Sequence, residues 1–101
     1  MSSFTDTLTR HDIHIEMPNM YSVIIHNDHI TTMEFVVHVL TDIFQKSPPE
    51  AAALMMDVHN KGQGVAGVYV FDIAATKKSQ ADKLASQHGF PLKLTLREVQ
   101  G

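Results

Sequence analysis

The sequence predicts an α+β fold, a two-layer sandwich with the order β-α-α-β-α-β in which three helices cover a three-stranded sheet. Three short segments are rich in β-branched and aliphatic residues, three longer ones carry apolar residues at helical spacing, and capping or turn residues separate them. Because the sheet has an apolar face that needs a cover, two layers are the simplest arrangement. With 101 residues, of which 44% are hydrophobic, the chain has room for one globular domain.

The first strand is expected over 20–26, where apolar and β-branched residues dominate. Residues 27–30 then break the pattern. Thr31 and Glu34 have the spacing of a capping box, in which a threonine hydroxyl and a glutamate carboxylate satisfy free helix N–H groups. A helix should follow, because apolar residues recur there on one helical face: Phe35, Val36, Val39, Leu40, Ile43 and Phe44.

The second helix has a clearer start at residues 47–50. Ser47 can cap it, Pro48 stands where its missing N–H costs nothing, and Glu50 completes a second capping box. Gly62 should end this helix, since glycine favours the left-handed C-terminal position.

A near-continuous apolar run over 65–71 is typical of a central strand. Gly62, Gly64 and Gly67 before and within it have the GxGxxG spacing of dinucleotide-binding loops. That fingerprint requires a strand, a turn and then a helix, whereas these glycines precede a strand. We interpret them as a turn with close backbone packing.

The third helix should extend through His88, with Asp72 as its cap and Gly89 and Pro91 as stop signals. Residues 92–99 alternate leucines with polar residues, which indicates a half-exposed strand. These patterns leave the direction of the strands open.

Composition excludes several classes of function. The net charge of -3 gives no basic face for nucleic acid, and zero cysteines exclude thiolate metal sites and cysteine nucleophiles. No apolar run approaches the roughly 18 residues that cross a bilayer. Residues 1–17 are polar and lack a signal-peptide pattern, so we expect a flexible extension before a domain at 18–101, and a cytoplasmic protein.

No residue pattern indicates catalysis or a cofactor, because no serine or threonine stands on a nucleophile elbow. The seven histidines leave a metal-binding module as an alternative: His11 and His14, like His26 and His29, are three apart, and His59 could complete a site. We favour solvated or turn histidines, since side chains at a strand end need not converge.

The turn at residues 27–29 is chemically more informative. Asn27 and Asp28 are ordinary turn residues, but with neutral His59 they offer an amide oxygen, a carboxylate and a ring nitrogen as acceptors. Converging acceptors suit an ammonium group, which has only donors. Methionines such as Met55 fill cores more often than pockets, although their thioethers also line adaptable pockets.

The turn belongs to a longer series of short motifs, which are Tyr21-Ser22-Val23-Ile24-Ile25-His26-Asn27-Asp28, Thr31-Thr32-Met33-Glu34-Phe35-Val36, Met55-Met56-Asp57-Val58-His59, Gly62, Gly67-Val68-Tyr69, Ala75-Thr76-Lys77 and His88-Gly89-Phe90-Pro91-Leu92. In these motifs, and over about residues 18–98, the chain resembles the ClpS family, the bacterial adaptors of the N-degron pathway.

The resemblance implies a non-enzymatic adaptor that holds the first residue of a substrate, typically Phe, Leu, Tyr or Trp, and delivers it to the ClpA unfoldase of the ClpAP protease. Met33 would act as the gatekeeper against β-branched first residues, and the extension at 1–17 would serve delivery. Asp72 and Lys77 would face the unfoldase. The implied α-amino site comprises Asn27, Asp28, His29 and His59, and the implied side-chain pocket comprises Ile30, Thr31, Met33, Val36, Met55, Val58 and Leu92.

His29 departs from the family pattern, which usually has a second carboxylate there. An imidazole is a weaker acceptor and repels an ammonium once protonated, and the positive end of the first helix lies in the same region. Thr32 stands where a proline is frequent. A second interpretation follows from His29: a modulator docked on the unfoldase, with weakened or altered recognition of first residues. The sequence does not rank the four first residues.

Overall fold

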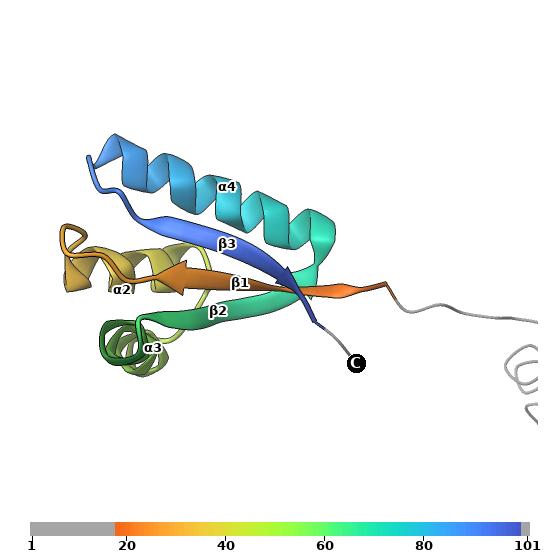
Figure 1. The fold of residues 1–101 in the computed structure, drawn as a ribbon, viewed down its shortest axis with the longest axis horizontal. Helices are drawn as coiled ribbons and strands as arrows, with labels where there is room; N and C mark the ends of the chain where they lie inside the picture. The colour runs from red at the N-terminus through yellow and green to blue at the C-terminus, as the bar shows by residue number, and fades with distance from the viewer. Residues whose placement is uncertain (1–17, 100–101) are drawn as a thin grey trace, which may run out of the picture.

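The structure, a computed structural model, describes residues 18–99 and contains three strands and three helices in the predicted order (Figure 1). The predicted α+β fold is confirmed. The extension predicted at 1–17 lies outside the described residues. In chain order the elements are β1 (Met20–His26), α2 (Met33–Asp42), α3 (Pro48–Lys61), β2 (Gln63–Val70), α4 (Phe71–Gln87) and β3 (Lys93–Glu98).

The sheet has the order β2-β1-β3, and both pairs of neighbouring strands are antiparallel. The central strand β1 is buried on both faces, since Val23, Ile24 and Ile25 are 0%, 2% and 0% exposed. Three consecutive buried residues explain why its sequence shows weak alternation.

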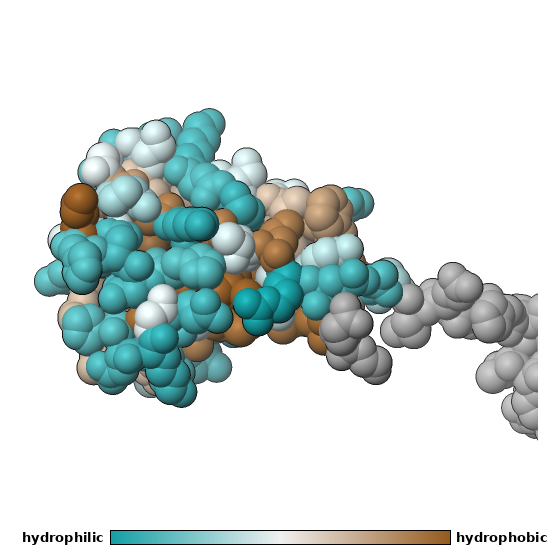
Figure 2. All heavy atoms as spheres, in the orientation of Figure 1, coloured by the Kyte–Doolittle hydropathy of each residue, from teal (hydrophilic) through white to brown (hydrophobic). Residues whose placement is uncertain are grey.

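The prediction that residues 65–71 form a central strand is wrong, because β2 lies at an edge of the sheet. Ala66 is buried in the core, but Val65 and Val68 pair with the outward side of β1 and are 45% and 46% exposed. Figure 2 shows mostly polar side chains on the viewed face, with apolar ones between them over the strands. A run of valines on one edge strand therefore has the hydropathy of a central strand without its burial.

All three helices pack on one face of the sheet. Buried residues of the three strands and the three helices form one cluster, from which Ile24 on the opposite face is absent. The helix α4 contacts every strand, and α3 contacts both β2 and α2. This packing brings the start of α2 and the end of α3 to the same end of β1.

The start of α2 differs by one residue from the predicted capping box. Thr32, and not Thr31, is the N-cap, and its hydroxyl accepts a hydrogen bond of 3.1 Å from the Phe35 N–H. The hydroxyl of Thr31 instead donates to Asp28. Two adjacent threonines give the same local signal, and the hydrogen bonds of the preceding loop decide which of them caps the helix.

The boundaries of α3 are confirmed. The Ser47 hydroxyl accepts from the Glu50 N–H at 3.3 Å, and the Glu50 carboxylate accepts from the Ser47 N–H at 2.9 Å, a complete capping box. Gly62 ends the helix in the left-handed conformation, with φ of 90°.

The start of α4 corrects another prediction. The helix begins at Phe71 after Val70, and no side chain caps it. Asp72 lies in the first turn, where its carboxylate still interacts favourably with the positive end of the helix. The helix ends at Gln87, and Gly89 follows with φ of 74° as a stop.

We expect Ser47→Ala to lower the free energy of unfolding by about 1 kcal/mol, because the substitution leaves the Glu50 N–H without its capping acceptor. Ser79→Ala on the exposed side of α4 is the control, since alanine is the better helix former there. Chemical denaturation of both variants measures the difference. Equal destabilisation by the two substitutions would contradict the capping role.

Candidate functional site

A cavity of about 230 Å³ opens between the loop that follows β1, the start of α2 and the last turns of α3. The wall of this cavity contains every residue implied for the α-amino site. It also contains every residue implied for the side-chain pocket except two. The lining residues are Asn27, Asp28, His29, Thr31, Met33, Val36, Met55, Val58 and His59.

The loop that carries the polar side of the cavity is held by one carboxylate. Oδ1 of Asp28 accepts from the N–H groups of Ile30 at 2.8 Å and Thr31 at 2.7 Å, and Oδ2 accepts from the Thr31 hydroxyl at 2.7 Å. An aspartate that binds the backbone two and three residues ahead stabilises a turn. The primary contacts of Asp28 are therefore within the loop.

The same contacts determine the charge of Asp28. Partial burial opposes ionisation, but the hydrogen bonds from Thr31 and Ile30 outweigh it and hold the pKa of the Asp28 carboxyl below its ordinary value. The nearby His29 acts in the same direction. A depressed folded-state pKa means that Asp28 stabilises the fold above its ordinary pKa. This contribution is lost only as the pH falls through the lower value. Asp28 thus remains a carboxylate throughout the neutral range.

A backbone hydrogen bond joins the loop to α3. The Asn27 N–H donates to the Gly62 carbonyl at 2.9 Å, so the loop is fixed to the residue that ends the helix. His59 lies in the last turn of this helix. Within residues 18–99 the Asn27 amide group and the His59 ring form no hydrogen bond, so both can bind a ligand. The carbonyl end of α3 adds partial negative charge, which favours a cation.

The inner part of the cavity is apolar. Val36 of α2 and Val58 of α3 are 6% and 3% exposed and form its floor. Met55 is half-buried in the wall, whereas Met33 is 41% exposed at the mouth. Flexible thioether side chains at these two positions can adapt to apolar groups of different shape.

Two residues that the resemblance implies for the pocket lie elsewhere. Ile30 is 66% exposed, because the turn at Asp28 places it at the tip of the loop. Leu92 is 7% exposed and packs in the core cluster. Neither lines the cavity.

Gly64 supports the cavity floor from behind, a role that the sequence pattern indicated only as close packing. A Cβ atom at this position would lie 3.0 Å from Cγ2 of Val58. Gly67 has a similar constraint, since a Cβ atom there would overlap the ring of Tyr69. The glycine spacing is thus explained by packing around β2, because Gly64 and Gly67 lie inside this strand and do not open a helix.

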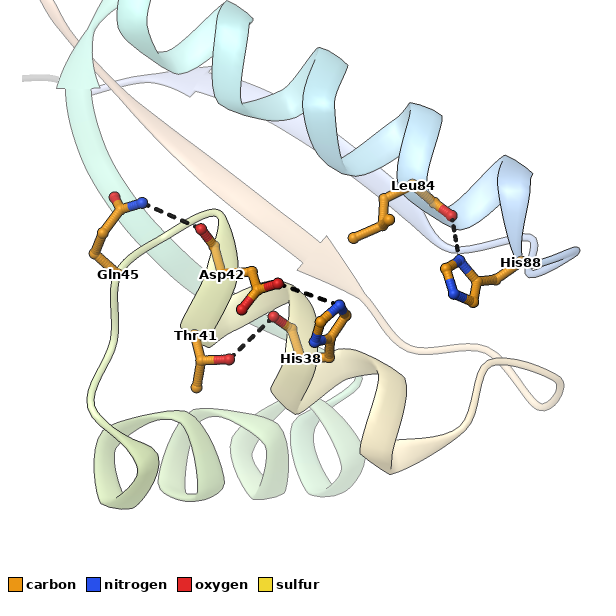
Figure 3. A network of polar contacts seen from close by, with 6 residues as sticks. All are labelled: His38, Thr41, Asp42, Gln45, Leu84 and His88. Atoms are coloured by element: carbon orange, nitrogen blue, oxygen red, sulfur yellow. Dashed lines mark hydrogen bonds and ion pairs between the residues drawn. The ribbon is translucent and has the colours of Figure 1, made fainter.

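The remaining described histidines have separate partners. The His26 ring forms a hydrogen bond of 2.7 Å with the Thr95 hydroxyl. Figure 3 shows the other two: the His38 ring lies 3.3 Å from the Asp42 carboxylate, and Nδ1 of His88 contacts the Leu84 carbonyl at 3.0 Å. No group of three or more potential metal ligands occurs within residues 18–99. The histidines at positions 11 and 14 lie outside the described residues.

Asp72 and Lys77 lie at the start of α4, at the other end of the sheet from the loop after β1 (Figure 1). Both line a shallow depression with Ile73, Thr76 and Gln80. The Lys77 ammonium donates to the Ile43 carbonyl and the Gln45 amide oxygen, each at 2.7 Å. Lys77 is therefore anchored, whereas Asp72 is fully available at the surface.

Among the helices of residues 18–99, none has the length and the apolar content that crossing a membrane requires.

Comparison with known proteins gives consistent matches. The family model for the ATP-dependent Clp protease adaptor protein ClpS matches residues 16–95. The adapter protein ClpS of Clostridium acetobutylicum is 55% identical over 85 residues, which cover 84% of this chain and 84% of the relative. That of Syntrophus aciditrophicus is 54% identical over 82 residues, which cover 81% and 77%.

A solved structure agrees with the fold. Agrobacterium tumefaciens ClpS2, bound to L-phenylalaninamide, superposes on this chain with a TM-score of 0.79 and 37% sequence identity. The match covers 82% of this chain and 100% of the ClpS2 chain. Taken with the family match and the sequence identities, the superposition shows that this chain belongs to the ClpS family of ATP-dependent Clp protease adaptor proteins.

Proposed function

We propose that this adaptor binds proteins through a free N-terminal amine and a bulky apolar first side chain, Phe, Leu, Tyr or Trp, and delivers them to the ClpA unfoldase of the ClpAP protease. One observation carries the proposal. The acceptors of Asn27 and His59 stand at the mouth of a cavity whose floor, Val36 and Val58, is apolar. A polar mouth above an apolar floor is complementary to a first residue and to its amine at the same time.

The amine would be bound mainly by neutral acceptors. An ammonium has three donors, and the Asn27 amide oxygen and a neutral His59 ring can accept two of them. Asp28 contributes its negative charge nearby, although the loop already uses most of its acceptor capacity. We propose His29 as the fourth group around the amine, the one with the weakest acceptor.

The first side chain would lie on the floor between α2 and α3. The ClpS2 structure supports this part, because L-phenylalaninamide combines a free amine with a phenyl group. Met33 at the mouth would contact the β-carbon region of the first residue and act as a gatekeeper against β-branched side chains.

Delivery requires a second surface that stays accessible while the cavity is occupied. The exposed carboxylate of Asp72 and the anchored ammonium of Lys77 belong to α4 and do not line the cavity. The start of α4 lies at the opposite end of the sheet from the loop after β1 (Figure 1). We propose that this surface docks on the N-terminal domain of the unfoldase.

His29 favours a second candidate function, that of a modulator that docks on the unfoldase but recognises first residues weakly. His29 lines the mouth in this chain and offers no carboxylate to an ammonium. Both functions share the docking surface and differ only in what the cavity binds.

A peptide that begins with Phe should bind the full chain, and its N-acetylated form should bind about 10- to 100-fold more weakly. Acetylation removes the charge and most donors of the amine and leaves the Asn27 and His59 acceptors unpaired. Fluorescence anisotropy with a labelled peptide measures both affinities. Equal affinities for the two peptides, or binding of neither, would favour the modulator.

Binding of the same peptide should weaken as the pH falls from 8 to 6, because an imidazole that gains a proton loses its acceptor and repels an ammonium. Asp28 stays ionised over this range and cannot be the cause. His29→Asp should bind more tightly than the wild type at pH 8 and lose less affinity at pH 6, with the remaining loss due to His59. Identical pH profiles for the two proteins would show that His29 has no part in amine binding.

Asp72→Arg should weaken binding to the isolated N-terminal domain of the unfoldase by about tenfold, because the substitution reverses a charge in the docking surface. Affinity for the Phe peptide should stay unchanged, since Asp72 lies far from the cavity. Lys83→Glu, an exposed charge reversal farther along α4, is the control. The docking surface is misplaced if the two variants bind the domain equally well.

A further inference from the structure

The mouth of the cavity has an unusual charge pattern. Of its lining residues, Asn27, His29, Met33 and His59 are the exposed ones and form the rim. The rim contains two imidazoles and neither a lysine, an arginine nor an exposed carboxylate. Whatever passes over it meets groups that are neutral or positively charged.

The single carboxylate in the cavity wall is largely occupied by hydrogen bonds within the loop. Asp28 is half-buried, and its two oxygens accept three hydrogen bonds from Ile30 and Thr31. A fourth acceptor position remains, so Asp28 can neutralise a nearby positive charge, but it does not form the rim. His29, its neighbour in the loop, is exposed and has no hydrogen bond within residues 18–99.

The proposed function determines which part of a substrate reaches this rim. If the first side chain occupies the floor at Val36 and Val58 and its amine lies at Asn27 and His59, the chain leaves through the mouth. The side chain of the second residue then extends from the backbone at the level of the exposed rim residues. Of the groups around the amine His29 has the weakest acceptor, so its ring is the one in the loop that can also donate to the second residue.

We propose, on the basis of this proposed function, that His29 reads the second residue of the substrate and makes the adaptor favour Asp or Glu there over a neutral or basic residue. A neutral imidazole donates one hydrogen bond to a carboxylate, and an imidazolium adds charge attraction. A second residue that is Lys or Arg gains neither. The preference for Asp or Glu is greatest at a pH at which the imidazole is protonated, although the overall affinity for the substrate is lower at that pH.

The other charged groups of the cavity wall, of the first turn of α2 and of the last turns of α3 are the same in the wild type and in the variant that tests this role. Asp28 of the loop and His59 of α3 line the cavity, and Glu34 lies in the first turn of α2. On α3, Asp57 and Lys61 form an exposed pair at 3.7 Å. All of these remain in a His29→Gln variant, which removes only the titratable ring and keeps a side chain that can donate a hydrogen bond.

The experiment measures a ratio of affinities rather than one affinity. Labelled peptides identical except for the second residue, Phe-Asp, Phe-Asn and Phe-Lys, are titrated with the full chain at pH 6 and pH 8 in low salt. At pH 6 the wild type should bind Phe-Asp about two- to fivefold more tightly than Phe-Asn, the size expected of an exposed ion pair. The ratio should approach one in high salt, because screening weakens exposed pairs.

The variants assign the ratio to one side chain. His29→Gln should reduce the ratio at pH 6 to about one, and His29→Asp should invert it through like-charge repulsion. His38→Gln is the matched control, because His38 is exposed on α2 next to Asp42 and does not line the cavity. It should keep the wild-type ratio.

Each outcome has a distinct meaning. A ratio near one in the wild type, or one that His29→Gln leaves unchanged, overturns the role of His29. The proposed function survives that result as long as Phe-Asn binds and its acetylated form does not. If Phe-Asn itself fails to bind at pH 8, both the proposed function and this inference are wrong.

Discussion

The hydrogen bond from the Asn27 N–H to the Gly62 carbonyl is the contact on which the site depends. It joins the loop after β1 to the residue that ends α3, two segments far apart in the sequence. Gly62 can offer that carbonyl because its left-handed conformation turns the chain abruptly out of the helix into β2. This hydrogen bond continues the pairing of β1 with β2, in which His26 lies opposite Gln63, and so fixes Asn27 against the end of the helix that carries His59.

Asp28 completes the arrangement by fixing the shape of the loop. Its three hydrogen bonds leave Thr32 as the cap of α2, and α2 then presents Met33 and Val36 to the cavity. The carboxylate thus determines the shape of the loop and of the cavity mouth. The hydrogen bonds that hold the loop also lower the pKa of Asp28, so the loop keeps both its shape and its negative charge across the neutral range.

The parts of the fold that could be predicted from the sequence are those specified by local chemistry. The Ser47 capping box and the Gly62 stop involve residues within a few positions of one another, and both were predicted correctly. The predictions failed where the deciding partner is distant or ambiguous. Thr31 and Thr32 are equivalent until Asp28 binds one of them, and the apolar run of β2 does not reveal how many neighbouring strands it has.

The site shows the same division. The residue types at Asn27, Asp28 and His59 indicated an ammonium site, but their convergence is a tertiary fact that arises from the packing of α3 against β2 and α2. The family resemblance implied this convergence. It also implied Ile30 and Leu92 as pocket residues, and the structure places both outside the cavity wall.

The cavity and the surface at Asp72 and Lys77 lie at opposite ends of the sheet. The cavity lies where β1 ends and β2 begins, whereas Asp72 and Lys77 lie where β2 ends and α4 begins. The single strand β2, which pairs with the central strand and buries Ala66 in the core, therefore spans the distance between the two surfaces. In the proposed function the adaptor binds two partners at once, and a sheet with one surface at each end lets them bind to separate residues. In the proposed function, selectivity is altered at one end, through His29 at the mouth, while the proposed docking surface at Asp72 and Lys77 stays the same.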